Sequence, residues 1–359
     1  VGSGAVRAYE AAKSENDPAA IVAQARAVKD DWTLSALVAA SQDKAIEVIE
    51  AALSSTPTDS LLVFATALTP TALTQGDAAQ NAARLLTACG SADPSAGPIA
   101  GGVLRAFADN VENPPSLNAS LRSALASLLE NENTRILALP VAILWDRSGI
   151  LSSQTGILTQ ALIESLSLSG LPDDQLIQIA RSLVSIREKN TSILPTIIGL
   201  LQSDSSESLK EGMLAALGSV GDEDLGQTLI DQFGSLEGSI KLKTFDQIVN
   251  RAPWAIQLLK EIDNGRFTPA DLGPGNIARL RHHPDRNVER AAHRLFARIA
   301  PVSSEKDDLI AELLPEVDRP GDPEKGKLLF AACSVCHQLG EIGTDVGPSL
   351  DGMGSHGAA

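Results

Sequence analysis

Apolar residues recur at three- and four-residue spacing along most of the chain, from Ala5 to about Leu314. Each stretch lasts roughly 10 to 16 residues and ends at Pro, Gly, Asn, Asp or Ser, which is typical of amphipathic helices. The pattern therefore predicts an all-α fold. The clearest predicted helices are 18–28, 32–40, 43–53, 58–68, 77–88, 117–130, 134–145, 172–187, 208–220, 222–233, 237–250, 253–262 and 287–299.

Aspartates stand directly before several of these helices. Asp17 precedes Pro18, and Asp31 precedes the next apolar stretch. An aspartate carboxylate can accept a hydrogen bond from a free N–H of the first turn, and proline suits the first helical position. We expect Asp17 and Asp31 to be N-caps, and Asp322 to cap a helix that begins at Pro323.

Two such helices with their turns occupy roughly 30 to 45 residues, which is the period of helix-pair solenoids. No fixed sequence signature repeats, so we expect residues 1–316 to form a HEAT-like α-solenoid, with an irregular helical bundle as the alternative. Three prolines and a glycine between Pro315 and Pro323 end the pattern. We interpret residues 317–322 as a linker and 323–359 as a second domain.

Composition and charge narrow the possible partners. Aromatic residues make up only 3% of the chain, which favours helices over sheet, and the net charge is −16. Such an acidic chain is repelled by nucleic acid and by anionic lipid surfaces, so we expect neither as a partner. The charge either attracts a basic redox partner or simply favours solubility. No apolar run reaches the roughly 18 residues of a membrane span.

Residues 333–337 read Cys-Ser-Val-Cys-His, the attachment signal of c-type haem. Positions i and i+3 lie on one face of a helical turn, so the thiols of Cys333 and Cys336 can form thioethers to the two vinyl groups of one porphyrin. His337 can then be the proximal ligand of the iron. The predicted cofactor is one covalent haem c. The third cysteine, Cys89, ends an apolar helical run, and we interpret it as a small buried hydrophobe.

The residues before and after the motif also form a recognisable pattern. Gly326 and Phe330 precede the first cysteine by seven and three residues, and Gly-Pro-Ser-Leu follows at 347–350. This arrangement resembles class I cytochrome c, in which a proline carbonyl accepts a hydrogen bond from the proximal histidine. The resemblance assigns that role to Pro348. Such an acceptor fixes the tautomer of the ligand and raises its basicity.

The longer segment 241–359 resembles haem-binding proteins of planctomycete and verrucomicrobial bacteria, in which a helical-repeat region carries a C-terminal cytochrome c module. The resemblance implies part of an exported, dehydrogenase-like system whose β-propeller is not seen in this sequence. Residues 1–240 match only as a generic helical repeat. The stretches that carry the resemblance are 251–255, 283–288, 321–326, 333–337 and 346–350.

The sixth haem ligand is the open part of this prediction. Class I cytochromes supply it, usually as methionine, from well beyond the Gly-Pro loop, but only 22 residues follow His337 here. Met353 and His356 are the candidates in this chain. We expect the cytochrome domain to be incomplete, so that it either continues in the native protein or is completed by a partner.

Three other interpretations of the motif fit the sequence less well. Structural zinc needs four ligands, and beyond His337 only His356 is near. A dithiol redox motif is expected beside a βαβ pattern, which this sequence lacks. A chance match without haem is disfavoured because Phe330, Gly347 and Pro348 stand at fitting positions.

One basic stripe contrasts with the acidic whole. Arg286, Arg290, Arg294 and Arg298 are spaced by four and so share one helix face. Two interpretations remain: a solvated face that pairs with nearby carboxylates, or a contact to haem propionates or to an acidic partner surface. Arginine suits the second because it binds carboxylates through two parallel hydrogen bonds.

Together these features predict an electron-transfer protein that passes electrons from a dehydrogenase unit to another carrier. The alternative is a helical-repeat scaffold for protein–protein interaction, with a cytochrome tail that has no redox function. No catalytic constellation is visible, so an electron carrier is favoured over a catalyst. Covalent haem attachment, as the resemblance implies it, predicts a periplasmic or other extracytoplasmic location in a bacterium.

Overall fold

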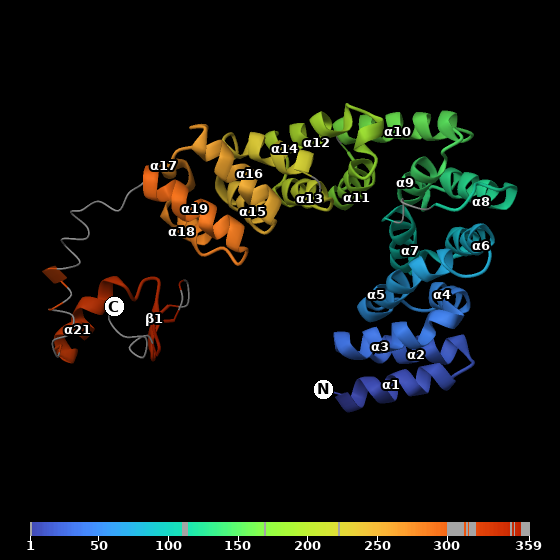
Figure 1. Ribbon diagram of the computed structural model, residues 1–359, viewed down its shortest axis with the longest axis horizontal. Coiled ribbons are helices and arrows are strands. Elements are labelled where there is room, and N and C mark those ends of the chain that lie inside the picture. The colour runs from blue at the N-terminus through green and yellow to red at the C-terminus, as the bar shows by residue number, and fades with distance from the viewer. Residues whose placement is uncertain are drawn as a thin grey trace. The chain divides into compact units, whose positions relative to one another are not determined.

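The computed structural model describes residues 2–109, 114–168, 170–221, 223–299, 312–313, 315, 321–344, 347 and 349–352. These residues are helical almost throughout (Figure 1). The only strands among them are β1 (Gln338–Leu339) and β2 (Ile342–Gly343), each two residues long. The prediction of an all-α fold is confirmed. In this described part of the chain, no helix is both long and apolar enough to cross a membrane.

The chain divides into two compact units, Val1–Trp254 and Ala255–Ala359. The α-helices of the first unit, called the helical array below, are α1 (Gly2–Ser14), α2 (Pro18–Ala27), α3 (Asp31–Ser41), α4 (Ala45–Leu53), α5 (Asp59–Leu68), α6 (Ala78–Ser91), α7 (Gly97–Asp109), α8 (Ala119–Glu130), α9 (Arg135–Trp145), α10 (Ser152–Ser167), α11 (Asp173–Val184), α12 (Ile193–Gln202), α13 (Glu207–Leu217), α14 (Glu223–Phe233) and α15 (Gly238–Val249).

Helix α16 (Ala252–Asp263) begins in the first unit and continues into the second. The other α-helices for which the structure describes the full range in the second unit are α17 (Pro269–Leu272), α18 (Pro274–Arg281), α19 (Arg286–Ile299) and α21 (Pro323–Leu329). Most of the predicted linker 317–322 lies outside the described residues, so the predicted boundary between two domains stays a prediction.

The predicted N-cap is confirmed at α2 and wrong at α3. The Asp17 carboxylate accepts a hydrogen bond from the backbone N–H of Ala19 at 2.9 Å. At α3 the cap is Asp30, whose carboxylate accepts from the N–H of Thr33 at 2.9 Å. Asp30 has the extended backbone that a cap requires, whereas Asp31 is the first helical residue. There its charge still favours the helix, because it lies at the positive end of the dipole.

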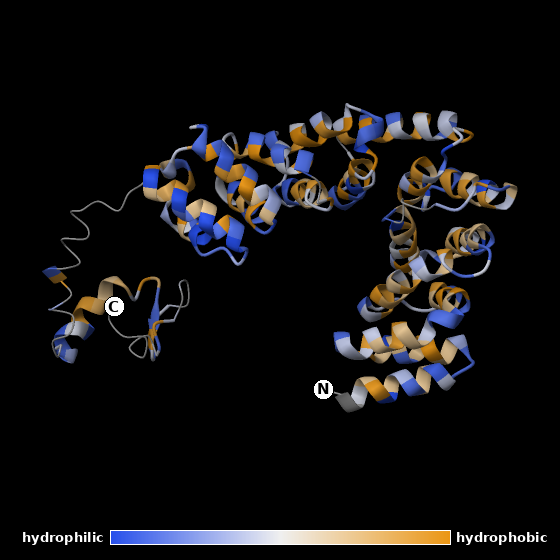
Figure 2. Cartoon of the chain, viewed as in Figure 1, coloured by the Kyte–Doolittle hydropathy of each residue, from blue (hydrophilic) through white to orange (hydrophobic). Residues whose placement is uncertain are grey.

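Helices of the array pack against near neighbours in chain order. α1 contacts α3, α2 contacts α4, α5 contacts α7, α6 contacts α8, and α11 contacts α13. In α11 the contact is made by one apolar stripe, Leu176, Ile179, Ala180 and Leu183, all buried. Helix α7 is instead buried on all sides, since every residue from 99 to 104 is buried. Figure 2 shows apolar and polar residues interspersed within each helix of the array, as an amphipathic helix requires.

Two glycines let neighbouring helices approach closely. A Cβ atom at Gly212 of α13 would lie 2.1 Å from Cδ1 of Ile177 in α11. A Cβ atom at Gly102 of α7 would lie 2.3 Å from Oγ1 of Thr66 in α5. Both distances are far below van der Waals contact, so a side chain at either glycine would force Ile177 or Thr66 out of its present position.

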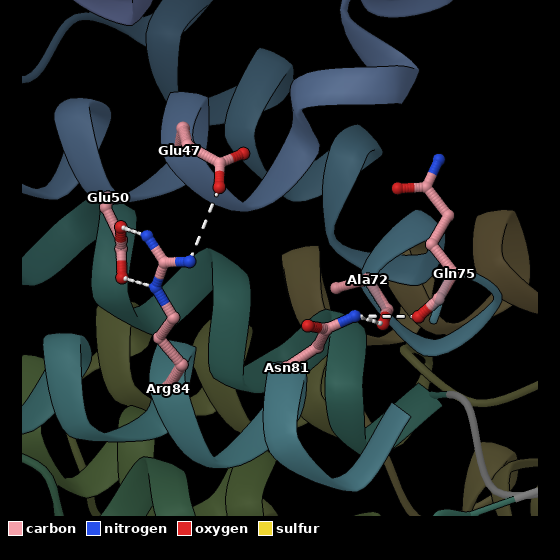
Figure 3. A network of polar contacts seen from close by, with 6 residues as sticks. All are labelled: Glu47, Glu50, Ala72, Gln75, Asn81 and Arg84. Atoms are coloured by element: carbon pink, nitrogen blue, oxygen red, sulfur yellow. Dashed lines mark hydrogen bonds and ion pairs between the residues drawn. The ribbon is translucent and has the colours of Figure 1, made fainter. Parts of the chain in front are cut away.

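Polar side chains add links between helices. Arg84 of α6 binds Glu50 of α4 through two hydrogen bonds, from Nε at 2.6 Å and from Nη2 at 2.5 Å, and reaches Glu47 at 3.3 Å (Figure 3). The hydrogen bond with Glu50 raises the pKa of Arg84. Asn81 of α6 donates to the carbonyls of Ala72 and Gln75 at 3.2 and 2.7 Å. These contacts hold α6 against α4 and against residues 72–75.

The second unit has its own core at the contact of α18 with α19. The guanidinium of Arg281 lies over the buried Phe296 ring, 5.6 Å from its centroid. The rings of His282 and His293 meet edge to face with centroids 6.3 Å apart. His283 is buried, and its Nδ1 accepts a hydrogen bond from the N–H of Asp285 at 3.0 Å. The buried His283 side chain therefore fixes the backbone of Asp285, the residue directly before α19.

Candidate functional site

Helix α21 leads the chain into the Cys-x-x-Cys-His motif. The Asp322 carboxylate accepts hydrogen bonds from the N–H groups of Glu324 and Lys325 at 3.1 and 3.3 Å, and Pro323 is the first helical residue. The hydrogen bond from the N–H of Lys325 holds the pKa of Asp322 below its usual range. The predicted cap is confirmed. A 3₁₀ turn, Phe330–Ala332, continues the helix to the first cysteine.

Residues 330–337 form two successive turns of helical backbone, and this segment is called the Cys-His turn below. The Phe330 carbonyl accepts hydrogen bonds from the N–H groups of Cys333 and Ser334 at 2.8 and 2.9 Å. The Cys333 carbonyl in turn accepts from Cys336 at 3.1 Å and from His337 at 2.9 Å. The two cysteines are therefore three residues apart on helically wound backbone. Both are exposed and neither is in a disulfide.

The chain then folds back on this turn. β1 pairs with β2 in antiparallel register, with Gln338 opposite Gly343. Thr344 donates from its N–H to the Ser334 carbonyl at 3.1 Å and from its hydroxyl to the Val335 carbonyl at 2.6 Å. The Cys-His turn is thus held from both sides in sequence, by α21 before it and by this short hairpin after it.

Gly347 brings the following loop against the imidazole of His337. Its N–H donates to the Cys336 carbonyl at 2.5 Å. A Cβ atom at this position would lie 2.8 Å from Cε1 and 2.9 Å from Nδ1 of His337. Only glycine lets the loop pass so close to the ring. Gly343 is similar, since it has φ +105° and a Cβ there would lie 2.0 Å from the His337 carbonyl oxygen.

Three of the predicted site residues lie outside the described residues: Pro348, Met353 and His356. The hydrogen bond from His337 to the Pro348 carbonyl and the choice of sixth ligand therefore stay predictions. In the ranges that the structure does describe, no group of three or more His, Cys, Asp or Glu side chains is arranged to hold a metal ion.

Large apolar side chains around the Cys-His turn are uncovered. Leu328 and Leu329 are each 77% exposed and Val335 is 68% exposed. Leu339 and Ile342 of the hairpin are each 44% exposed. No side chain of α21 or of the 3₁₀ turn is buried. This is unlike the helical array, in which every α-helix from α2 to α15 buries apolar side chains.

A covalently attached haem fits these residues. Two accessible, unpaired thiols lie on one helical turn, and an imidazole follows directly, which is the donor set of a c-type haem. The uncovered apolar side chains suit a large, mainly apolar macrocycle, because covering them would remove apolar surface from water. Cys333 and Cys336 would hold the porphyrin, and His337 would ligate the iron.

Cys89 has a different environment from the cysteines of the motif. It lies in α6 and is 2% exposed, and this burial raises the pKa of its thiol to about 12. A thiol in an apolar surrounding is inert, because the reactive species is the thiolate. The interpretation of Cys89 as a buried hydrophobe is confirmed.

The four arginines of the basic stripe are all exposed on α19. Arg290, Arg294 and Arg298 line a groove between α16 and α19, whereas Arg286 does not. Lys260 of α16 lines the same groove. The sequence pattern missed Lys260 because it lies 30 residues before Arg290, and only the packing of the two helices brings them together.

No known protein-family model matches the chain, and no curated protein is significantly similar to it. The resemblance to class I cytochrome c therefore rests on the motifs around the Cys-His turn.

Proposed function

We propose that this chain is a c-type haem protein that transfers electrons. The observation that carries the proposal is the Cys-His turn: two free, exposed cysteines on one helical turn, an imidazole directly after them, and uncovered apolar side chains around them. In this proposal the chain carries one covalent haem c, and the cytochrome-like segment 323–359 is the first part of a class I-like domain.

Each residue of the site has a separate role in this proposal. Cys333 and Cys336 bind the porphyrin through thioethers, and His337 binds the iron. Gly347 keeps the following loop against the imidazole, where the Pro348 carbonyl would accept the second ring N–H and orient the ring. Met353, His356 or a partner protein would supply the sixth ligand. When bound, the haem supplies the one-electron redox chemistry.

The helical array supports a structural role beside the haem. Its helices contact near neighbours in chain order, and every α-helix from α2 to α15 buries apolar side chains. HEAT-like α-solenoids have this kind of connectivity, so we propose that the array is one and that it presents the haem to its redox partners. The donor would be a dehydrogenase-like protein or domain, as the resemblance implies.

The test is to express the full chain behind a bacterial export signal, together with the haem c maturation machinery. We expect a Soret band and a pyridine haemochrome spectrum, with haem that stays attached after denaturation. Without the export signal we expect no covalent haem, because the proposed location is the periplasm. A colourless exported protein would contradict the proposal.

The matched variants use the three cysteines of the chain. Cys333→Ala together with Cys336→Ala should abolish covalent haem, since both thioether positions are lost. Cys89→Ala should keep it, because Cys89 is buried in α6 and belongs to the helical array. Haem that remains covalently bound in the double variant would rule out attachment at the Cys-His turn.

A second function, a protein scaffold, is favoured by the same order of helix packing in the array, since solenoids commonly bind other proteins along extended surfaces. In that case the double cysteine variant would still assemble with its partners and nothing would depend on haem. Partner binding and electron transfer can therefore be separated by measuring both on the same variant.

A further inference from the structure

An open groove of about 650 Å³ lies between α16 and α19. Its floor is apolar, because Ile256, Leu259, Ala291 and Leu295 line it. Leu259 and Leu295 are buried to 4% and 7% exposure, so they form a fixed base. The polar residues that line the groove are Lys260, Asp263, Asn287, Arg290, Arg294 and Arg298.

The groove is strongly positive, although the chain is acidic. Four cations and one carboxylate line it, which leaves a net charge of +3 in a chain of −16. Arg298 forms an ion pair with Asp263, so the one carboxylate is already used. Among the described residues, the Arg290 guanidinium bonds only neutral oxygens, those of Asn287 at 2.9 Å and of the Arg286 backbone at 3.1 Å.

Two of the cations lack any side-chain partner. Neither Lys260 nor Arg294 forms a hydrogen bond or ion pair through its side chain within the part of the chain that the structure describes. Uncompensated charges of one sign beside low-dielectric walls attract ligands of the opposite sign. A ligand that these charges attract is therefore anionic.

The spacing of the cations indicates an elongated ligand with repeated charges. Arg290 and Arg294, which have no carboxylate partner in the described part of the chain, are four residues apart, so they follow one another at roughly 6 Å along the axis of α19. Carboxylates at positions i and i+4 of a second helix have the same spacing. The floor residues suit the apolar stripe that such a helix carries beside its acidic one.

We propose that this groove binds an acidic, amphipathic α-helix of a partner protein. Its glutamates or aspartates would pair with Lys260, Arg290 and Arg294, and its apolar residues would cover Leu259 and Leu295. Helices commonly dock into apolar grooves through anchors at i, i+3 and i+4. The site is separate from the Cys-His turn, so the proposal holds whether or not the chain carries haem.

Other anionic ligands fit less well. A nucleic acid would extend beyond the groove over a protein of net charge −16, which repels phosphate backbones. A small inorganic anion would leave the apolar floor uncovered. Both are outcomes that the experiment below can reveal.

The probe is a fluorescein-labelled synthetic 18-residue helical peptide with glutamate at every fourth position beside a row of leucines. The control peptide has glutamine at each of those glutamates and the same leucines. Titration of the full chain at low salt should give saturable binding of the glutamate peptide. The glutamine peptide should bind at least tenfold more weakly, and added salt should weaken only the glutamate peptide.

The variants separate the groove from the rest of the stripe. Lys260→Gln together with Arg294→Gln should weaken the glutamate peptide at least tenfold. Arg286→Gln is the matched control, because Arg286 is on the same helix but does not line the groove, and it should change binding by less than twofold. All three side chains are exposed, and circular dichroism would verify that each variant keeps its helices.

A zero-length carbodiimide crosslink would locate the peptide, since Lys260 is the only lysine among the described residues that line the groove. We expect a peptide carboxylate joined to Lys260, found by mass spectrometry. Lys260→Arg should keep the binding and lose the crosslink. Absence of saturable binding, equal loss in Arg286→Gln, or displacement of the peptide by an oligonucleotide or by inorganic phosphate beyond that caused by sodium chloride at the same ionic strength would each overturn the proposal.

Discussion

Helices α2 and α21 begin in the same way and end in different environments. Both start with Asp-Pro, and in both the aspartate carboxylate accepts a hydrogen bond from the N–H two residues on, at 2.9 Å for Asp17 and 3.1 Å for Asp322. Yet α2 buries Ile21, Val22 and Ala25, whereas Leu328 and Leu329 of α21 are each 77% exposed.

The difference shows that local signals suffice to start a helix but not to bury it. A cap satisfies an N–H group within the same segment, so it needs no other part of the chain. Burial needs a second surface. In the array the neighbouring helix provides that surface. At α21 we propose that haem provides it and covers at least part of the exposed apolar side chains.

The largest contrast expected between the two regions is in thiol chemistry. In the haem-free chain at pH 8, an alkylating reagent should react quickly with Cys333 and Cys336, which are exposed. Cys89 should react at least about a thousandfold more slowly, because its pKa is raised from 9.0 to about 12 and the thiolate is the nucleophile. Mass spectrometry of the labelled peptides would measure both rates.

The same shift has a consequence for stability. The folded state favours the neutral Cys89 thiol. The contribution of this thiol to the free energy of unfolding is therefore fully present below about pH 9 and is lost as pH rises toward 12.

The control for the labelling experiment is denaturant, which should expose Cys89 and abolish the difference in alkylation rate between Cys89 and the two cysteines of the motif. Rapid labelling of Cys89 in the folded chain would mean that α6 is not packed as described.

The next largest difference expected between α2 and α21 is the stability cost of truncating an apolar side chain. Ile21→Ala removes a fully buried side chain from α2 and should lower the free energy of unfolding by about 2–5 kcal/mol. Leu328→Ala in the haem-free chain should change it by less than about 0.5 kcal/mol, because the side chain is exposed. Urea denaturation followed by circular dichroism measures both. A cost at Leu328 as large as that at Ile21 would show that α21 packs like the array and would break the comparison.

Two glycines of the array should respond in opposite ways to substitution by alanine, because one is closely packed and the other is open. Gly212→Ala should cost about 1–3 kcal/mol, since the new methyl group would collide with Ile177. Gly199→Ala in α12 has nothing within 4 Å and should instead stabilise by up to about 1 kcal/mol through helix propensity. Thermal unfolding of the two single variants should therefore shift in opposite directions. Stabilisation by Gly212→Ala would mean that Ile177 can move aside at little cost.

The smallest expected difference concerns the caps themselves. Asp17→Ala should lower the stability of the array by about 1 kcal/mol, which is the usual effect of losing an N-cap. Asp322→Ala should leave the unfolding midpoint of the array unchanged, because α21 buries nothing. Denaturant titrations of both variants test this. An equal effect of the two substitutions would indicate that α21 unfolds together with the array.

Much of the fold was predictable because its signals are local. Apolar spacing identified most of the helices, although no predicted range covers α7, α10 or α12. The caps at Asp17 and Asp322 follow from residue type and position. The error at Asp31 arose between two adjacent aspartates, which sequence cannot rank. The backbone decides, since only Asp30 has extended dihedral angles.

The candidate site also has local features that the sequence predicts and other features that depend on tertiary contacts. The spacing of Cys333, Cys336 and His337 determines that they share one helical turn, because that geometry depends only on residues next to one another in the chain. The close approach of Gly347 to His337 needs the hairpin, and the burial of Cys89 needs the helices around α6.

What the sequence by itself determined is therefore every feature that a few consecutive residues can satisfy: helical periodicity, most helix starts, and the donor set of the Cys-His turn. Tertiary structure alone decided which surfaces meet. Lys260 and Arg294 are 34 positions apart and line one groove only because α16 and α19 pack together. Helix geometry is fixed by local hydrogen bonds, whereas a groove depends on non-local apolar contacts that no short pattern encodes.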